Sequence, residues 1–277
     1  MKNINDSDIQ MCIDTPEILY KYRSLSGDNF GFTRDIFLKN ELYFPHPDEI
    51  NDPFDCKIPP SFKKISKKLL IDKITEIESK PDKFKFDPFV IELAKNGVIS
   101  NNLETITETL QSKYNEKHLQ NVGILSLSEE KFDIRMWSHY SNSHKGICIG
   151  FNWIKLYVIF NGTHLHADNV KYPKFNQYPV WNPFIDDPQE EINKLYFTKS
   201  LDWSYEKEWR IVFPEKGGTA QNFNPNAIVS VHLGCHINKE HKENVINWCL
   251  QRKQKPKIYE ITKDEESYSL QEKEVKY

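Results

Sequence analysis

Residues 204–213, "SYEKEWRIVF", have the alternation of a single β-strand and an unusual distribution of charge. Because side chains alternate between the two faces of a strand, one face carries aromatic and apolar residues that suit a core. The other face carries Glu206, Glu208 and Arg210 in a row. Two carboxylates about 6.7 Å apart repel by about 2.5 kcal/mol where the effective dielectric is about 20. The row is therefore either a solvated face with cross-strand ion pairs or the wall of a cleft.

Outward from this stretch, short strands dominate and a few helices lie between them. No GxGxxG or phosphate-loop sequence is present. Helices collected in one insert, with short strands elsewhere, favour an α+β fold over a doubly wound sheet. Strands are expected at 17–25, 41–44, 121–130, 145–151, 169–172, 227–234 and 257–261, and helices just before Asn40, at 132–144 and at 239–252.

Residues 61–119 differ in character from the rest of the chain and predict a helical insert. Within them Ile65, Leu69, Ile74 and Ile77 lie near one helical stripe that is surrounded by lysines. A second helical spacing covers 103–114. This insert is expected as a lid, and its lysine-rich face is either a solubilising surface or a rim that attracts phosphate.

The chain has 277 residues, enough for one large domain or two small ones. We expect a single domain over 1–277 that carries the insert. The C-terminal residues 262–277 are polar and charged, and they predict a tail whose end frays.

The composition is that of an ordinary globular protein, with 38% hydrophobic and 28% charged residues. The net charge of −3 provides no overall positive field that would attract nucleic acid. No apolar run suits a signal peptide or a membrane span. The five cysteines are scattered without a C-x-x-C pair, which argues against a disulfide framework and a zinc site. A cytoplasmic protein with reduced thiols is expected.

The loop "NDPFD" contains Asn51, Asp52 and Asp55. Asn and Asp before Pro usually shape turns through bonds to the backbone, and the loop is otherwise a candidate to lie beside a ligand. His139, in "MWSHY", is either a packed helix residue or a general base. A metal-dependent nuclease or hydrolase built on Asp52, Asp55 and His139 is one alternative, although the leading interpretation expects no metal.

Six separated motifs occur in the order found in one bacterial family. They are "YKYRSL", "LYF", "NDPFD", "ILSLSE", "MWSHYSNSHKGICIGF" and "WSYEKEWRIVF". By these motifs, residues from about 18 to 235 resemble the bacterial domain of unknown function numbered twenty-nine seventy-one. The resemblance implies a family without implying a chemistry.

The order of "LYKYRS", a helix, "LYF", "ILSLSE", "YSNSHKGICIGF" and "EKEWRI" also resembles the ADP-ribosyltransferase fold, in the branch of the DNA-targeting toxins. This resemblance implies a split antiparallel β-sheet core with NAD bound in a cleft. By position, Glu208 matches the catalytic glutamate of that fold and Glu206 its companion. The NAD-binding positions implied are Arg23 or Tyr22, Ser126 or Ser128, Tyr140 with Trp137 as the aromatic wall, and Arg23 or Arg210 for the pyrophosphate. The chain departs from the toxin branch in lacking its early histidine and in carrying the long insert.

The resemblance implies an NAD-binding enzyme that transfers ADP-ribose or cleaves NAD, as a toxin or an anti-phage defence effector. NAD would be the substrate, and the acceptor would be a protein, a nucleic acid or water. No metal and no membrane would take part. The main alternative is a non-catalytic module that binds a nucleotide-like ligand or a protein as a sensor.

Overall fold

The computed structural model describes residues 15–58, 61, 66–80, 88–100, 121–160, 165–175, 177–182, 184 and 186–276. The chain divides into two compact units. The first, which we call the sheet unit, comprises Met1–Pro45, Gly123–Asn169 and Asp202–Tyr277. The second, the helical unit, comprises His46–Val122 and Val170–Leu201. Whether the two units act as the single predicted domain stays a prediction.

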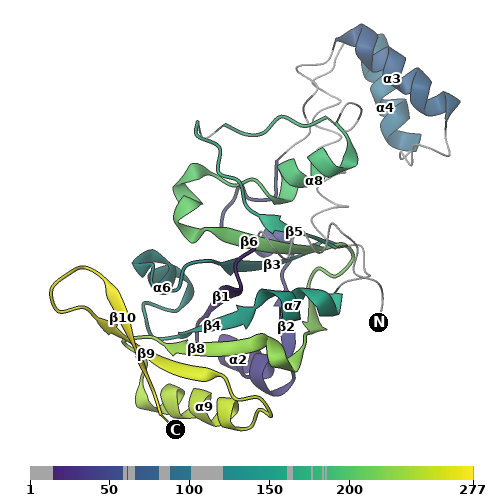
Figure 1. Cartoon of the computed structure of the whole chain (residues 1–277). Coiled ribbons are helices and arrows are strands. Elements are labelled where there is room, and N and C mark those ends of the chain that lie inside the picture. The colour runs from purple at the N-terminus through teal and green to yellow at the C-terminus, as the bar shows by residue number, and fades with distance from the viewer. Residues whose placement is uncertain are drawn as a thin grey trace. The chain divides into compact units, whose positions relative to one another are not determined.

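A large, mostly antiparallel sheet forms the body of the sheet unit (Figure 1). Its strands in the described residues are β1 (Ile18–Arg23), β3 (Gly123–Ser128), β4 (Ile147–Asn152), β5 (His166–Asn169), β6 (Glu208–Phe213), β8 (Ile228–Leu233), β9 (Lys257–Lys263) and β10 (Leu270–Glu274). They lie in the order β10-β9-β8-β4-β1-β3-β6-β5, with a parallel pairing between β8 and β9. The prediction of an α+β protein is confirmed, because several helices accompany this sheet.

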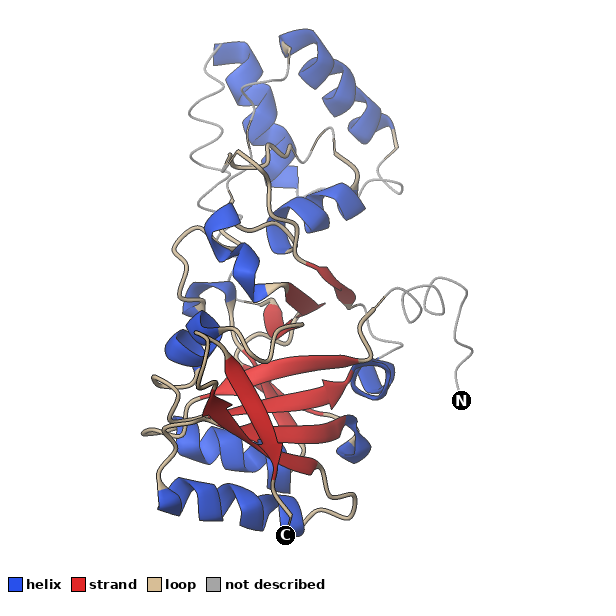
Figure 2. Cartoon of the chain, turned by 60° about the vertical axis from the view of Figure 1, so that its left-hand side comes forward, coloured by secondary structure: helices blue, strands red, loops and turns tan. Residues whose placement is uncertain are grey.

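One face of the sheet packs against helices α2 (Asn29–Leu38), α7 (Trp153–Phe160) and α9 (Lys239–Leu250). Strand residues such as Leu127 and Ile211 are buried in this core. Helices α2 and α9 lie side by side below the sheet in Figure 2, and the rings of Phe30 and Trp248 meet edge to face at 5.1 Å. This face is the apolar core that the alternating strands predicted.

Helix α6 (Ile134–Tyr140) covers the opposite face of the sheet. The alternation of β4 points Cys148 to this side, where it packs with Met136 and Trp137 of the helix. The Asp133 side chain caps the helix by accepting hydrogen bonds from two amides of its first turn. The sheet is therefore buried on both faces where α6 covers it.

Helix α2 turns directly into strand β2 (Glu41–Phe44) at Asn40. Asn40 has a φ of 58°, the left-handed conformation that asparagine tolerates better than most residues. Strand β2 then pairs with β7 (Thr219–Asn222) in a separate two-stranded sheet. The predicted turn from helix to strand at Asn40 is confirmed.

The described part of the helical unit contains helices with a core of their own. Helix α3 (Lys67–Ser79) contributes Leu70, Ile74 and Ile77, and Phe184 packs with them. The predicted stripe included Leu69, but the structure buries Leu70 and leaves Leu69 exposed. The helices are η1 (Pro47–Glu49), α3, α4 (Pro88–Ser100) and α8 (Pro188–Tyr196), and Ile65 and the helical spacing at 103–114 lie outside the described residues.

The stretch 204–213 is not one strand. Leu201–Glu206 form the 3-10 helix η2, and β6 begins at Glu208. Lys207, between them, has a φ of 39°, which interrupts an extended backbone. The prediction that Glu206 and Glu208 share one strand face is therefore wrong.

Residues 262–277 carry the end of β9 and the strand β10 where the sequence predicted a fraying tail. Contacts across the sheet hold this strand, because Glu272 forms an ion pair with Lys131 at 2.7 Å. Charged residues are common on an edge strand, so they did not exclude pairing here. The strand predicted at 169–172 is also displaced, since β5 ends where that range begins and Lys171 forms an isolated bridge. None of the described helices is long and apolar enough to cross a membrane.

Candidate functional site

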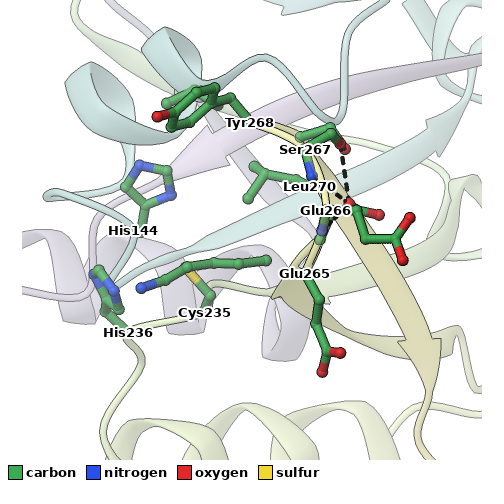
Figure 3. Close-up of a pocket in the computed structure, with 12 residues that line it drawn as sticks. His144, Cys235, His236, Glu265, Glu266, Ser267, Tyr268 and Leu270 are labelled. Atoms are coloured by element: carbon green, nitrogen blue, oxygen red, sulfur yellow. Dashed lines mark hydrogen bonds between the residues drawn. The ribbon is translucent and has the colours of Figure 1, made fainter.

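The residues predicted for the NAD site come from β1, β3, α6, η2 and β6. Strand β3 lies between β1 and β6 in the sheet. In this register Ser126 lies opposite Arg210 and Ser128 opposite Glu208. Opposite residues of antiparallel strands share a face, so these four side chains occupy one face of the sheet. The pocket drawn in Figure 3 lies elsewhere, and none of the predicted residues lines it.

Glu208 and Arg210 form a buried ion pair on this face. The Arg210 Nε donates to Glu208 Oε1 at 2.7 Å, and Nη2 donates to Oε2 at 2.9 Å. Only 1% of Arg210 and 4% of Glu208 is exposed. The row of charge is therefore not a solvated face, and the guanidinium compensates the carboxylate through the two-point contact that such pairs favour.

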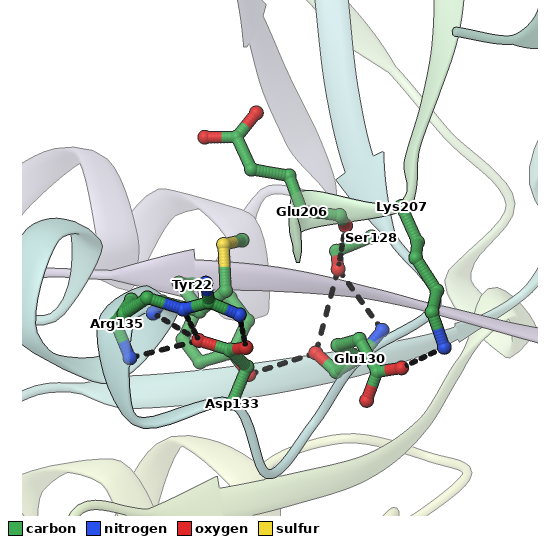
Figure 4. A network of polar contacts seen from close by, with 8 residues as sticks. Tyr22, Ser128, Glu130, Asp133, Arg135, Glu206 and Lys207 are labelled. Carbon is green, nitrogen blue, oxygen red and sulfur yellow. Dashed lines mark hydrogen bonds and ion pairs between the residues drawn. The ribbon is translucent and has the colours of Figure 1, made fainter. Parts of the chain in front are cut away.

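Glu206 joins this cluster from outside the strand. Its carboxylate accepts a hydrogen bond from the Tyr140 hydroxyl at 2.5 Å, and its backbone carbonyl accepts one from Ser128 Oγ at 2.5 Å. Figure 4 shows Ser128 between Glu206 and Glu130, whose amide donates to the same hydroxyl at 2.9 Å. Lys207 forms an ion pair with Glu130 next to them. Tyr140 thus contacts the Glu206 carboxylate, and Ser128, opposite Glu208 in the sheet, contacts the Glu206 backbone. The two glutamates belong to different elements.

Tyr22 and Trp137 are core residues between the sheet and α6. The Tyr22 hydroxyl donates to the Glu130 carbonyl at 2.7 Å, and burial raises its pKa far above the usual value. Its ring meets Trp137 edge to face, with centroids 5.2 Å apart. Trp137 is fully buried, and its Nε1 donates to the Lys131 carbonyl at 2.8 Å. Of the predicted aromatic wall, Tyr140 is the member that reaches the carboxylates.

Arg23 lies apart from the other predicted residues. Its Nε donates to Thr33 Oγ1 at 3.2 Å, and Nη2 donates to Asn29 Oδ1 at 3.4 Å. Burial lowers its pKa. Because Tyr22 is its neighbour in β1, Arg23 points to the opposite face, where α2 lies. Of the two alternatives for the early position, Arg23 is directed at α2 and Tyr22 at α6.

Lys21 is a charged residue near the site that the sequence analysis missed. Its Nζ donates to the Ser126 carbonyl at 3.2 Å. Burial lowers its pKa to about 7, and Arg23 lowers it while Glu208 raises it. The available signal was the alternation of β1, which pairs Lys21 with the buried Leu19 on the core face. By the same alternation Lys21 lies on the core face and Glu208 on the opposite face of the sheet, so burial in the core is the main cause of the lowered pKa of Lys21.

The loop residues and His139 have ordinary structural surroundings. The Asp52 side chain accepts a hydrogen bond from the Phe54 amide at 2.9 Å, which is the turn-shaping role weighed in the sequence analysis. Asp55 forms a buried ion pair with Lys199 at 3.4 Å. Asn51 is exposed. His139, on α6, is also exposed and lies edge to face with Tyr140. Among the described residues, no group of three or more His, Cys, Asp or Glu side chains is arranged to hold a metal ion.

Comparison with known proteins identifies one family. Residues 136–211 match the model of the family described as "Protein of unknown function (DUF2971)", and they include most of α6, the strand β4, Glu206, Glu208 and Arg210. The resemblance to this family predicted from the motifs is confirmed. No curated protein and no solved structure matches the chain.

Proposed function

We propose that the sheet unit has an ADP-ribosyltransferase-like fold, binds NAD, and either transfers its ADP-ribose or cleaves it. The observation that carries this proposal is a set of polar contacts around adjacent strands: Glu208 pairs with Arg210 opposite Ser128 and Ser126, and Glu206 accepts hydrogen bonds from Ser128 and Tyr140. Buried carboxylates in contact with charged partners are frequent in functional sites. The mostly antiparallel sheet is also compatible with the proposed fold.

The chemistry assigns a distinct role to each carboxylate. The bond between nicotinamide and the ribose C1 breaks, and nicotinamide leaves with the bonding electron pair. The ribose then carries an oxocarbenium-like charge, which Glu208 stabilises while Glu206 acts as its companion. One preorganised polar group aimed at developing charge is worth about 2.7–4 kcal/mol. The acceptor, or water, then forms the new bond to C1 and loses a proton.

Arg210 has two successive partners in this proposal. Without NAD its guanidinium holds both oxygens of Glu208. A pyrophosphate offers the same two-point geometry to a guanidinium, so its arrival releases Glu208 to the ribose. The buried ion pair is then the resting form of the site, and NAD binding converts it to the active form.

The test combines NAD calorimetry with nicotinamide release in the parent protein and in Glu206→Gln. The variant keeps an acceptor for the Tyr140 hydroxyl, so the fold and most of the NAD affinity should persist. Turnover should fall at least tenfold, which corresponds to about 1.4 kcal/mol of lost transition-state stabilisation. The matched control is Glu243→Gln, an exposed glutamate on α9, which should turn over like the parent. Absence of NAD binding in the parent, or equal turnover in Glu206→Gln, would contradict the proposal.

A non-catalytic sensor module is the second candidate. The observation that favours it is that both Glu208 oxygens already accept hydrogen bonds from Arg210. This candidate predicts saturable NAD binding with no release of nicotinamide. Growth arrest on expression in bacteria, relieved in Glu206→Gln, would support the enzyme and a role as a toxin or defence effector.

A further inference from the structure

A pocket of about 600 Å³ lies beside α6 and the β9–β10 hairpin, outside the cluster described above. All of its lining residues belong to the sheet unit. Its volume lies within the range of about 300–1,000 Å³ that is typical of small-molecule sites. A second hollow of about 600 Å³ shares part of the same hairpin loop. The hairpin that the sequence predicted as a tail thus forms a wall of the pocket.

Basic side chains gather on one wall. His144, His236 and Lys263 line the pocket, and the two imidazole centroids are 5.7 Å apart. The backbone brings them together, because the His236 amide donates to the His144 carbonyl at 3.0 Å. Burial lowers the pKa of His144, and the neighbouring His236 and Lys263 lower it further. Each basic group makes protonation of its neighbours less favourable. An anion placed between them therefore stabilises their protonated forms.

The acidic residues of the lining do not neutralise this wall. Asp264 is committed to the hairpin loop, since its carboxylate accepts from the Glu266 and Ser267 amides at 2.9 and 2.8 Å. In Figure 3 the carboxylates of Glu265 and Glu266 point away from the two histidine rings. The basic wall therefore faces the open pocket.

The loop that carries His144 has an unusual backbone. Asn142, Ser143 and His144 have φ values of 51°, 56° and 66°, three successive non-glycine residues in the left-handed region. Such residues are uncommon, and they persist where surrounding structure holds them. Here the His144 ring stacks on the fully buried Trp137, with centroids 6.3 Å apart and planes 10° from parallel. The loop thus holds one basic group at a fixed position.

Apolar and aromatic side chains form a further part of the wall. They are Ile134, Leu270 and Tyr268, and Figure 3 shows the Tyr268 ring on the same side of the pocket as His144. Burial raises the pKa of the Cys235 thiol, which keeps this lining group neutral. A flat apolar ring is the ligand part that such a wall accommodates.

We propose that this pocket binds a small organic anion, a phosphate or carboxylate attached to a flat apolar ring. The anionic group lies among His144, His236 and Lys263, and the ring lies against Tyr268 and Leu270. This site is separate from the proposed NAD cluster and does not depend on it. A metal ion is the less suitable occupant, because no group of three or more ligating side chains among the described residues is arranged for one.

The experiment is a titration followed through the histidine ring resonances in the full chain. Phenyl phosphate and benzoate are the two anionic probes, inorganic phosphate tests the anion alone, and phenol tests the ring alone. We expect saturable shifts of His144 and His236 with at least one aromatic anion, at a dissociation constant below about 10 mM. Phosphate and phenol should bind at least about tenfold more weakly, and the stronger aromatic probe identifies the anionic group.

Two exposed lining residues supply the variants. His236→Gln and Lys263→Gln should each weaken binding of the better probe about tenfold without lowering the melting temperature. The matched controls, His241→Gln and Lys253→Gln, replace residues of the same types outside the pocket and should bind like the parent. No saturable shift up to about 10 mM of either aromatic anion, or unchanged affinity in both pocket variants, overturns the proposal. Equal binding of phenol would also overturn it, since the basic wall would then contribute nothing.

Discussion

Lys21 shows how burial changes the charge of a single side chain. Its folded pKa of about 7 lies below the ordinary value of 10.5. The unfolded chain therefore binds more protons between these two values, and the free energy of unfolding should rise with pH across this window. Between pH 7 and 9 the rise should be about 2 kcal/mol. Urea denaturation at the two pH values measures it, and Lys21→Met should flatten the dependence. Equal slopes in the two proteins would show that Lys21 does not titrate there.

His232 forms part of a second buried polar group that the sequence analysis did not identify. Ser230 Oγ lies 3.0 Å from His232 Nε2, and Nδ1 lies 2.9 Å from Glu272 Oε2 without the alignment of a hydrogen bond. The order of the three groups matches a hydrolase triad. However, Ser230 is buried, and its Oγ lies 2.2 Å from where a side chain at Gly150 would begin. We interpret the group as a network of the core, with His232 stacked on Tyr259 at 5.1 Å.

This interpretation predicts a loss of stability in acid. Burial lowers the pKa of His232 to about 4 from the ordinary 6.5, although Glu272 raises it. Because the folded value is the lower one, the unfolded chain binds the extra proton as the pH falls through this window. Between pH 7 and 5 the free energy of unfolding should fall by about 2 kcal/mol on this account. In His232→Gln that part of the decrease should vanish, as measured by denaturant titration at both pH values.

Alternation within a strand predicted the neighbouring positions of Glu208 and Arg210, and the structure pairs them on β6. Alternation could not predict that Glu206 lies outside the strand, because this depends on the left-handed conformation of Lys207, which no local sequence pattern indicates. The proximity of Tyr140 to Glu206 is a contact across 66 positions of sequence. Sequence periodicity predicts which residues share a face of one helix or strand. It does not predict which residues of different elements come into contact, because that depends on how the elements pack.

Strand β6 is buried along its whole length, so the ion pair between Glu208 and Arg210 should contribute strongly to the stability of the protein. Glu208→Gln removes the carboxylate charge that accepts two hydrogen bonds from the Arg210 guanidinium in a buried place. Breaking one half of a buried pair costs about 3–5 kcal/mol. We therefore expect a clear drop in melting temperature, in spite of the similar side-chain volume. The double variant Glu208→Gln/Arg210→Met should recover most of the loss; if it is no more stable than the single variant, the charge is not the cause.

The start of strand β4 depends on a close backbone approach at Gly146. A side chain there would begin 2.1 Å from the Arg23 carbonyl oxygen, and a backbone atom cannot move aside without shifting β1. Gly146→Ala should therefore destabilise the protein by several kcal/mol, because the backbone must become strained to make room for the new side chain. The matched control is Gly31→Ala in α2, where no atom lies within 4 Å, and it should be neutral or stabilise by about 0.5–1 kcal/mol. Thermal melts of both variants test the pair, and a similar shift in the two would refute the steric explanation.

Individual helices and strands were predicted correctly where the hydrophobic periodicity and the turn-forming residues indicated the same boundaries. The helix ending before Asn40 and the strands β1, β3 and β4 are examples. Helix α7 was missed because "WIKLYVIF" is apolar at nearly every position and has no helical stripe to detect. Strand β10 was missed because its five residues are mostly charged, and its pairing with β9 is a property of the sheet edge.

For the whole molecule, composition and pattern predicted an α+β protein but not the order of its strands. The sheet unit is assembled from three segments of sequence, and the helical unit from two. The two ends of the first interruption meet, because the Ile124 amide donates to the Pro45 carbonyl at 3.0 Å. Beyond the second interruption, β6 pairs with β3, although the two strands are far apart in sequence. Motif order led to the proposed site residues, whereas strand order decides which of them lie opposite one another in the sheet.

The two units have separate hydrophobic cores, and this predicts how the protein unfolds. Leu19 lies in the core of the sheet unit and Leu70 in that of the helical unit, both fully buried. Replacing a buried leucine by alanine costs about 2–5 kcal/mol. Leu70→Ala should lower hydrogen-exchange protection in α3 and α4 and leave the amides of β1, β3 and β4 protected as in the parent. Leu19→Ala should do the reverse, because stability is local wherever cores do not share side chains. If either substitution reduces protection equally in both units, the chain unfolds as one cooperative body and the two cores are not independent.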